Sequence, residues 1–273
     1  MVIKPVEKIG KYGGTWRTGL RGGQDTAWLT RTINYENLLR WDPDWQTVIP
    51  NVAESVQASP DGSEFTFKLR KGMKWSNGDP FTADDLVFGF EDVLMNEELN
   101  PTKPTWLVSG GKPGTITKVD DYTVTYKFST PNGLFLQRNA CPGGTGLVRY
   151  PQKYLKQFHK KYNTANLDKL IADGKFKDWV ELFRTMGANI PGTPYDALWA
   201  QKDLPTLHGW YLTTPYTGSG RVVAERNPYY WKVDTEGNQL PYIDKVVYEV
   251  GDDVQVLVLK ALNGEIDMMD RHI

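Results

Sequence analysis

The residue types that most often carry out chemistry are few in this sequence, and they do not cluster. The three histidines, His159, His208 and His272, lie far apart, and none has a second histidine or a carboxylate at ligand spacing. The single cysteine, Cys141, excludes an internal disulfide, and we interpret it as a buried structural thiol rather than a nucleophile. The glycine clusters match neither a phosphate-binding loop nor a dinucleotide fingerprint. We therefore expect no catalytic residue, no metal site and no cofactor.

Two pairs of neighbouring carboxylates are the remaining candidates for catalysis, because glycosidases use two such groups. The pairs Asp84-Asp85 and Asp252-Asp253 both precede runs of apolar residues at helical spacing. A carboxylate at the start of a helix is stabilised by the free backbone N–H groups and by the helix dipole. This structural role explains both pairs, so we expect that the protein is not an enzyme. A carbohydrate-active hydrolase is kept as the alternative.

The composition excludes several classes of protein. Of the 273 residues, 32 are Lys or Arg and 33 are Asp or Glu, so the net charge is 32 − 33 = −1. This balance leaves no basic field for nucleic acid, and no apolar run reaches the roughly 18 residues that span a bilayer. The 10 Trp, 14 Tyr and 10 Phe are consistent with either a large core or a site for peptides or sugars.

The sequence pattern predicts a mixed α/β or α+β fold with an inserted β-rich part. Thr82 followed by Asp85 approximates a capping box, although Asp replaces the usual Glu. Asp253 is expected to cap a second helix that Asn263-Gly264 ends. The expected strands are 15–20, 65–69, 116–119, 122–128, 221–224 and 245–250, and the expected helices include 27–40, one from Thr82, and 254–262.

One stretch is specific enough to indicate a family. Residues 65–86, FTFKLRKGMKWSNGDPFTADDL, resemble the signature of the family 5 extracellular solute-binding proteins, the dipeptide-, oligopeptide- and nickel-type receptors of ABC importers. The motif has a physical reason: Asn77-Gly78 permits a turn with positive φ, and Pro80 and Thr82 prepare a helix start. It is therefore a structural motif, and it names no ligand contact.

Further stretches resemble the same family in the expected order. These are residues 34–39, 225–231, 240–244 and 261–267. Where the family commonly has Gly-Thr-Gly-Pro-Tyr, this chain has Leu-His-Gly-Trp-Tyr at 207–211, and it carries an insertion at 237–240. These departures indicate a divergent branch and leave the identity of the solute open.

The resemblance implies a fold and a domain division. The fold is an α/β periplasmic-binding-protein type II lobe with an inserted β-rich subdomain. The lobe is expected at 1–45 and 201–273 and the subdomain at 46–200, with the second lobe absent from this chain. A strand that starts near Glu265, close to the last residue, likewise predicts an N-terminal half of a longer protein.

The resemblance also implies a function without covalent chemistry. The protein is expected to be a monomer that captures a peptide or oligosaccharide-like solute and delivers it to the transmembrane permease subunits of an ABC importer. A solute-sensing receptor on the same fold is a further alternative. We expect the protein in the periplasm or anchored at the cell surface, with its leader already removed. The candidate ligand-binding residues are Gly22, Gly23, Asp25, Tyr35, Glu36, Asn37, Cys141, Trp210 and Tyr211.

Overall fold

The computed structural model describes residues 1–33, 35–187, 199–218 and 220–269. The chain forms two compact units. Unit 1 comprises Met1–Tyr35, Ser76–Gly78 and Pro194–Ile273, and unit 2 comprises Glu36–Trp75 and Asp79–Thr193. The expected division into a lobe and an inserted subdomain, with boundaries at 45 and 200, stays a prediction.

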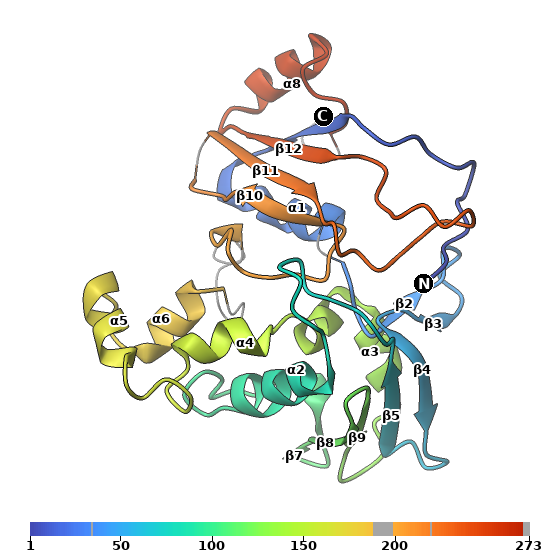
Figure 1. The fold of residues 1–273 in the computed structure, drawn as a ribbon, viewed down its shortest axis with the longest axis vertical. Coiled ribbons are helices and arrows are strands. Elements are labelled where there is room, and N and C mark those ends of the chain that lie inside the picture. The colour runs from blue at the N-terminus through green and yellow to red at the C-terminus, as the bar shows by residue number, and fades with distance from the viewer. Residues whose placement is uncertain (34, 188–198, 219, 270–273) are drawn as a thin grey trace. The chain divides into compact units, whose positions relative to one another are not determined.

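Unit 1 is built on a four-stranded sheet (Figure 1). The central pair, β12 (Lys245–Val250) and β11 (Gly220–Arg226), is antiparallel. At one edge, β1 (Thr15–Leu20) runs parallel to β12, and at the other β10 (Trp210–Thr214) runs antiparallel to β11. The predictions of strands at 15–20, 221–224 and 245–250 are confirmed.

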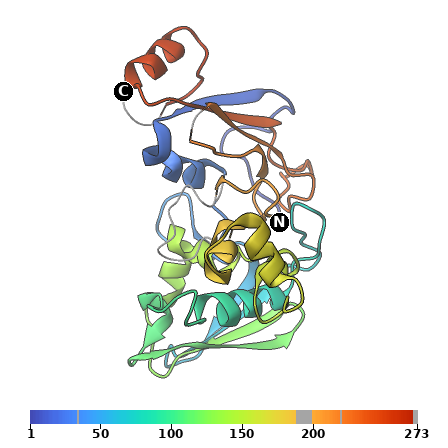
Figure 2. The same ribbon diagram turned by 90° about the vertical axis from the view of Figure 1, so that its left-hand side faces the viewer.

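The two faces of this sheet are covered by different helices, α1 (Thr26–Ile33) and α8 (Val254–Leu262), which lie on opposite sides of it (Figures 1 and 2). Leu29 of α1 packs into a buried apolar cluster with Val222 and Tyr248 of the sheet. On the other side, Leu257 of α8 is buried, and a Cβ at Gly19 would lie 3.4 Å from its side chain. Alternate residues of the strands therefore serve different faces.

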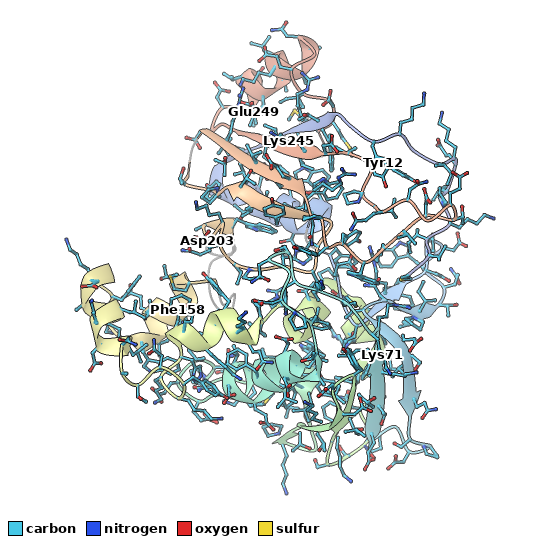
Figure 3. The ribbon with its side chains drawn as sticks, in the orientation of Figure 1. Tyr12, Lys71, Phe158, Asp203, Lys245 and Glu249 are labelled. Atoms are coloured by element: carbon cyan, nitrogen blue, oxygen red, sulfur yellow. The ribbon has the colours of Figure 1, made fainter. Side chains whose placement is uncertain are left out.

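The face of the sheet opposite α1 carries paired charges. Arg221 and Glu249 are directly opposite one another on β11 and β12 and form an ion pair of 2.5 Å. Lys245 and Glu225 form a second pair of 3.2 Å at the other end of the same two strands. Figure 3 labels Lys245 and Glu249 on β12. Cross-strand pairs of opposite charge each contribute roughly 0.2–1 kcal/mol, so ion pairs add to the burial of Leu257 on this face.

Unit 2 contains an antiparallel sheet in the order β4 (Ala53–Ala58), β5 (Glu64–Leu69), β9 (Thr123–Lys127), β8 (Thr115–Asp120). The inward positions of β5 and β9 carry large aromatic side chains, as period-2 alternation requires. Their rings surround Phe135 of α3 (Phe135–Ala140), which is fully buried and lies 4.8 Å from Phe65 and 5.5 Å from Tyr126 between ring centroids. Many of the abundant aromatics thus build the core of this unit.

The helix after the family motif starts as predicted. Thr82 and Asp85 form the capping box of α2 (Ala83–Val87), and the Thr82 N–H donates to Asp85 Oδ2 at 2.9 Å. The helix continues as a wider π-type segment, η2 (Phe88–Leu94). Gly78 adopts φ +88°, so the Asn77-Gly78 step uses the backbone freedom of glycine. The predicted capping box and turn are both confirmed.

The prediction of a helix over 27–40 is wrong in its second half. Helix α1 spans Thr26–Ile33. Further along, Leu39–Trp41 forms strand β2, which pairs with β3 (Val48–Pro50). The apolar residues Leu38 and Leu39 suit helical spacing, but pairing with β3 decides their conformation. Further short elements are η1 (Gly22–Asp25), η3 (Thr105–Leu107), β6 (Val108–Ser109), β7 (Lys112–Pro113), η4 (Pro142–Leu147), α4 (Gln152–Leu155), η5 (Lys156–Phe158), α5 (Leu167–Gly174) and α6 (Trp179–Thr185).

Candidate functional site

The first group of candidate residues lies at the carboxyl edge of the unit 1 sheet. Because β1 and β12 are parallel, η1 follows β1 at the same edge where Asp252 follows β12. The loop after β1 and the loop after β12 lie close together. A Cβ atom added at Gly22, whose φ is +51°, would lie 2.9 Å from Asp252 Oδ1. In open α/β sheets, ligands bind at the carboxyl ends of strands, so this edge is a candidate ligand surface.

Asp25 shapes the loop at this edge. Its side chain is only 3% exposed, and its Oδ2 accepts a hydrogen bond from the Arg21 N–H at 2.7 Å. The Thr26 hydroxyl donates to the Gly23 carbonyl at 3.1 Å and ties the loop to α1. Asp25 therefore orders the backbone of the loop, and Gly23 is exposed.

Sequence reasoning missed Tyr216, which follows β10 at the same edge. A Cβ at Gly23 would be 3.4 Å from the Tyr216 hydroxyl, and the Tyr216 N–H donates to the Trp199 carbonyl at 2.8 Å. Strand β10 runs parallel to β12, since each is antiparallel to β11, so its carboxyl end reaches this edge. Only the strand order could have identified this residue.

Trp210 and Tyr211 lie at the opposite end of the same sheet. They begin β10, whereas Gly22–Asp25 follow the end of β1, so a strand length of roughly 17–20 Å separates the two sets. The Trp210 indole donates to the Ile243 carbonyl at 3.0 Å and packs against the apolar cluster on the α1 side. Tyr211 is half-buried and pairs in register with Glu225. The structure does not bring these two residues together with Gly22–Asp25.

The second group of candidates belongs to unit 2 and forms a buried network of amides. Asn37 is fully buried, and its Nδ2 donates to the carbonyl oxygens of Asn139 at 2.8 Å and Cys141 at 2.7 Å. Asn51 Nδ2 donates to Glu36 Oε2 at 2.7 Å and to the Asn37 carbonyl at 2.9 Å. Glu36, Asn37 and Cys141 are thus brought together, and Asn51 and Asn139 are members that the sequence did not reveal.

The amide network holds backbone segments in place, but some of its polar atoms have no hydrogen-bond partner. The Leu39 N–H donates to Asn139 Oδ1 at 3.2 Å, which ties β2 to α3. Within the described residues, Asn37 Oδ1, Asn51 Oδ1 and Asn139 Nδ2 are buried without a hydrogen-bond partner. An unpaired buried polar atom costs about 1–3 kcal/mol, so water or a polar group of a ligand would stabilise this network. Cys141 is a half-buried free thiol, and Tyr35, also half-buried, is the last residue of the first segment of unit 1.

Two buried carboxylates outside these groups have unusual electrostatics. Burial raises the pKa of Asp85 to about 6, although its carboxylate accepts the N–H groups of Thr82 and Gln152. For Asp234 burial acts in the same direction, but hydrogen bonds from Tyr242 and Asn238 outweigh it and lower the pKa to about 2. Asp85 caps α2 and ties it to the first residue of α4, and Asp234 holds the turn through residues 236–238, so both have structural roles.

His159 has a structural role as well. It is 1% exposed and lies among aromatic rings, with the centroid of Trp179 at 5.0 Å and that of Phe183 at 5.3 Å. Burial lowers the pKa of its imidazole. Across the part of the chain that the structure describes, no three His, Cys, Asp or Glu side chains gather as a metal-binding group. No helix in that part is long and apolar enough to cross a membrane.

Comparison with known families decides the identity of the scaffold. The sequence pattern of the bacterial extracellular solute-binding proteins, family 5 (middle region), matches residues 47–272. The chain belongs to this family. Its members are transport binding proteins rather than enzymes.

Two curated relatives illustrate the similarity of sequence. The periplasmic alpha-galactoside-binding protein of Rhizobium meliloti (strain 1021) is 31% identical over 96% of this chain and 37% of its own length. The periplasmic oligopeptide-binding protein OppA of Escherichia coli (strain K12) is 26% identical over 86% of this chain and 37% of its own length. The chain therefore spans less than two fifths of the length of these relatives.

Two solved structures of binding proteins share the fold. An oligopeptide-binding protein OppA matches 99% of this chain and 40% of its own, with 40% identity and a TM-score of 0.88. The binding protein MelB of Agrobacterium fabrum C58, solved with stachyose, matches 95% of this chain and 37% of its own, with 28% identity and a TM-score of 0.70. The predicted α/β fold of the type II periplasmic binding proteins is confirmed.

Proposed function

We propose that the whole protein is the solute-binding component of an ABC importer. It captures an oligosaccharide of the alpha-galactoside type or a short peptide and presents it to the transmembrane permease subunits. The observation that carries this proposal is the family match over residues 47–272, with sequence and fold similarity to binding proteins for both solute classes. Capture involves no covalent step. A hydrolase and a solute-sensing receptor are the alternatives.

The proposed ligand surface in unit 1 is the loop Gly22–Asp25 with its neighbour Tyr216. Gly23 exposes backbone, and the buried Asp25 carboxylate holds that backbone in place through the Arg21 N–H. A loop of fixed shape loses little conformational entropy when it binds a solute. Glu36, Asn37 and Cys141 would act in unit 2 by positioning the chain, because Asn37 itself is fully buried. Tyr35, Trp210 and Tyr211 stay candidate contacts.

The proposed location is outside the inner membrane, in the periplasm or anchored at the cell surface, with the protein acting as a monomer. This location follows from the proposed function, because a binding protein of an importer must meet its solute before the permease does. The relatives whose names state a location are periplasmic.

A thermal-unfolding screen of the full-length protein against raffinose and trialanine tests the function. A solute at 100 times its dissociation constant stabilises the native state by about 2.7 kcal/mol, so one of the two should raise the melting temperature clearly. Chromatography of the same samples should recover the solute intact. Hydrolysis of the solute, or no stabilisation by either class, would contradict the proposal.

A substitution tests the ligand surface. Asp25→Ala removes the acceptor that orders the loop, and we expect the dissociation constant of the stabilising solute to rise about tenfold, equivalent to about 1.4 kcal/mol. The matched control is Glu97→Gln, because Glu97 is 81% exposed in unit 2. Equal affinity of both variants would remove the loop from the proposed site while leaving the function itself standing.

A further inference from the structure

The hairpin formed by β2 and β3 presents two stacked tryptophans in unit 2. The rings of Trp41, the last residue of β2, and Trp45, in the connecting loop, lie 6.3 Å apart between centroids with an interplanar angle of 20°. Stacking of this kind covers one face of each indole, and Trp45 is exposed while Trp41 is half-buried. Nothing in the solute site described above uses these residues.

The loop that carries Trp45 is held in one conformation. The Trp45 N–H donates to the Asp42 carbonyl at 3.0 Å, which closes a β-turn, and the Gln46 N–H donates to Asp42 Oδ1 at 2.8 Å. Asp42 and Pro43 are favoured at the first two positions of such a turn, whereas glycine is favoured at the fourth. Trp45 occupies that fourth position with φ +57°, in the left-handed region that bulky residues rarely adopt.

Burial does not compensate for this unfavourable conformation. Trp45 remains 67% exposed, and it is the one exposed residue among the ten tryptophans, all of which fall within the described ranges. A left-handed conformation costs a residue with a side chain roughly 1–2 kcal/mol. Stacking on Trp41 offsets part of that cost, but glycine would remove it altogether. Folding of the hairpin alone therefore does not explain an indole at this position.

We propose that Trp41 and Trp45 form a platform that binds one pyranose ring of a neutral oligosaccharide, at a site separate from the solute site. The C–H face of the sugar lies on the outer indole face, and its equatorial hydroxyl groups reach the polar rim. The polar groups that we assign to this rim are the exposed side chains of Asp44 and Gln46, which flank Trp45 in the chain, and Gln46 Nε2 also donates to the Asp44 carbonyl at 3.2 Å. Carboxylate and amide groups accept from and donate to sugar hydroxyls.

The base of the hairpin gives the platform the rigidity that a weak site needs. The Leu39 N–H is held by Asn139 Oδ1, and the Asn51 N–H donates to the Leu38 carbonyl at 3.0 Å. A platform that is already ordered loses little entropy when a ring stacks on it. Because a single ring buries little area, the dissociation constant should be on the order of 1 mM. The choice of oligosaccharide as the ligand class rests on the proposed function.

Fluorine NMR of the full-length protein labelled with 5-fluorotryptophan tests the platform. The Trp45 resonance is assigned from its loss in Trp45→Phe, and raffinose is then added while the melting temperature is followed in parallel. We expect the Trp45 resonance to shift and saturate in the millimolar range. In Trp45→Gly the response of Trp41 should be lost, while the melting temperature without sugar is unchanged or higher, because glycine accepts φ +57°.

The outcomes separate the two proposals. A rise in melting temperature with raffinose but no shift of the Trp45 resonance would overturn the platform and leave the solute site. A saturating Trp45 shift accompanied by a rise in melting temperature that Trp45→Gly abolishes would support the platform, and it would refute solute-site binding of that sugar. A Trp45 shift produced equally by arginine at the same ionic strength would identify a cation site and overturn the sugar proposal.

Discussion

Asp85 in unit 2 and Asp234 in unit 1 are both almost inaccessible to solvent, at 4% and 1% exposure, yet their pKa values move in opposite directions. Asp85 accepts two backbone N–H groups, from Thr82 and Gln152. Asp234 accepts the backbone N–H groups of Glu236 and Asn238, the Asn238 amide at 2.9 Å and the Tyr242 hydroxyl at 2.6 Å.

The difference shows that exposure alone does not decide whether a carboxylate stays charged. Burial disfavours the charged form at both sites, but Asp85 lies deeper in its unit and beside Asp84, whereas the hydrogen bonds to Asp234 outweigh its weaker desolvation. The same reasoning applies to the asparagines of unit 2, where three side-chain amide atoms have no hydrogen-bond partner within the described residues. A buried polar group stabilises the fold only when its hydrogen-bonding capacity is used.

The largest expected effect on stability is that of Asp85→Asn, and it depends on pH. Its raised pKa means that its contribution to stability is fully present below about pH 4 and is lost as the pH rises through about 6. Asp85→Asn does not titrate, so its stability relative to wild type should improve by about 3 kcal/mol between pH 3 and pH 7. Urea unfolding at a series of pH values measures this. A pH-independent difference would mean that Asp85 titrates normally.

Asp234→Asn should show the opposite pH dependence. A lowered pKa contributes stability above about pH 4, and this contribution is lost as the pH falls through about 2. The variant should therefore be less stable than wild type at pH 7, with a difference that shrinks between pH 4 and pH 2. Acid unfolding followed by circular dichroism measures it. A deficit that grows on acidification would contradict the lowered pKa.

Thr82→Ala should have a smaller effect, confined to the start of α2. It removes the side-chain oxygen of the capping box, which typically contributes about 1 kcal/mol. Thr82→Ser keeps a hydroxyl at the same place and is the matched control. We expect urea unfolding to show the loss for alanine and near wild-type stability for serine. Equal losses would point to the methyl group rather than the hydroxyl.

Tyr242→Phe should have the smallest effect, since it removes one of the hydrogen bonds to Asp234. The pKa of Asp234 should rise above about 2, and carbon NMR of the side-chain carboxyl measures this directly. Tyr12→Phe is the control, because the Tyr12 hydroxyl donates to the Gln239 carbonyl instead. If both variants left the pKa unchanged, the remaining donors would account for the whole shift.

The sequence predicts those parts of this molecule that local interactions decide. The capping box of Thr82 with Asp85 and the cap of α8 by Asp253, whose side chain accepts from the Gln255 N–H, each involve residues close in the chain. The family motif locates the scaffold for the same reason. Leu39 shows the limit, because β2 depends on pairing with residues 48–50 and not on the helical spacing of its own neighbours.

The candidate site depends still more on distant parts of the chain. Tyr216 reaches Gly23 only because β10 is parallel to β12, and Trp210 is displaced from that edge for the same reason. Asn139 meets Asn37 across roughly 100 positions of sequence, which no spacing rule could reveal. Predicting these neighbours would require the strand order of the sheet.

The two ion pairs between β11 and β12 favour the native register of these strands over shifted registers. The strands are separated by a long connection, and no tight turn fixes how they meet. If β11 slid by two residues in one direction, Arg221 and Glu225 would face Val247 and Ile243; in the other, they would face Gly251 and Val247. Either slip keeps the alternation of faces but separates all four charges from their partners. The charged face thus distinguishes the native pairing from the misalignments that the apolar face alone would accept.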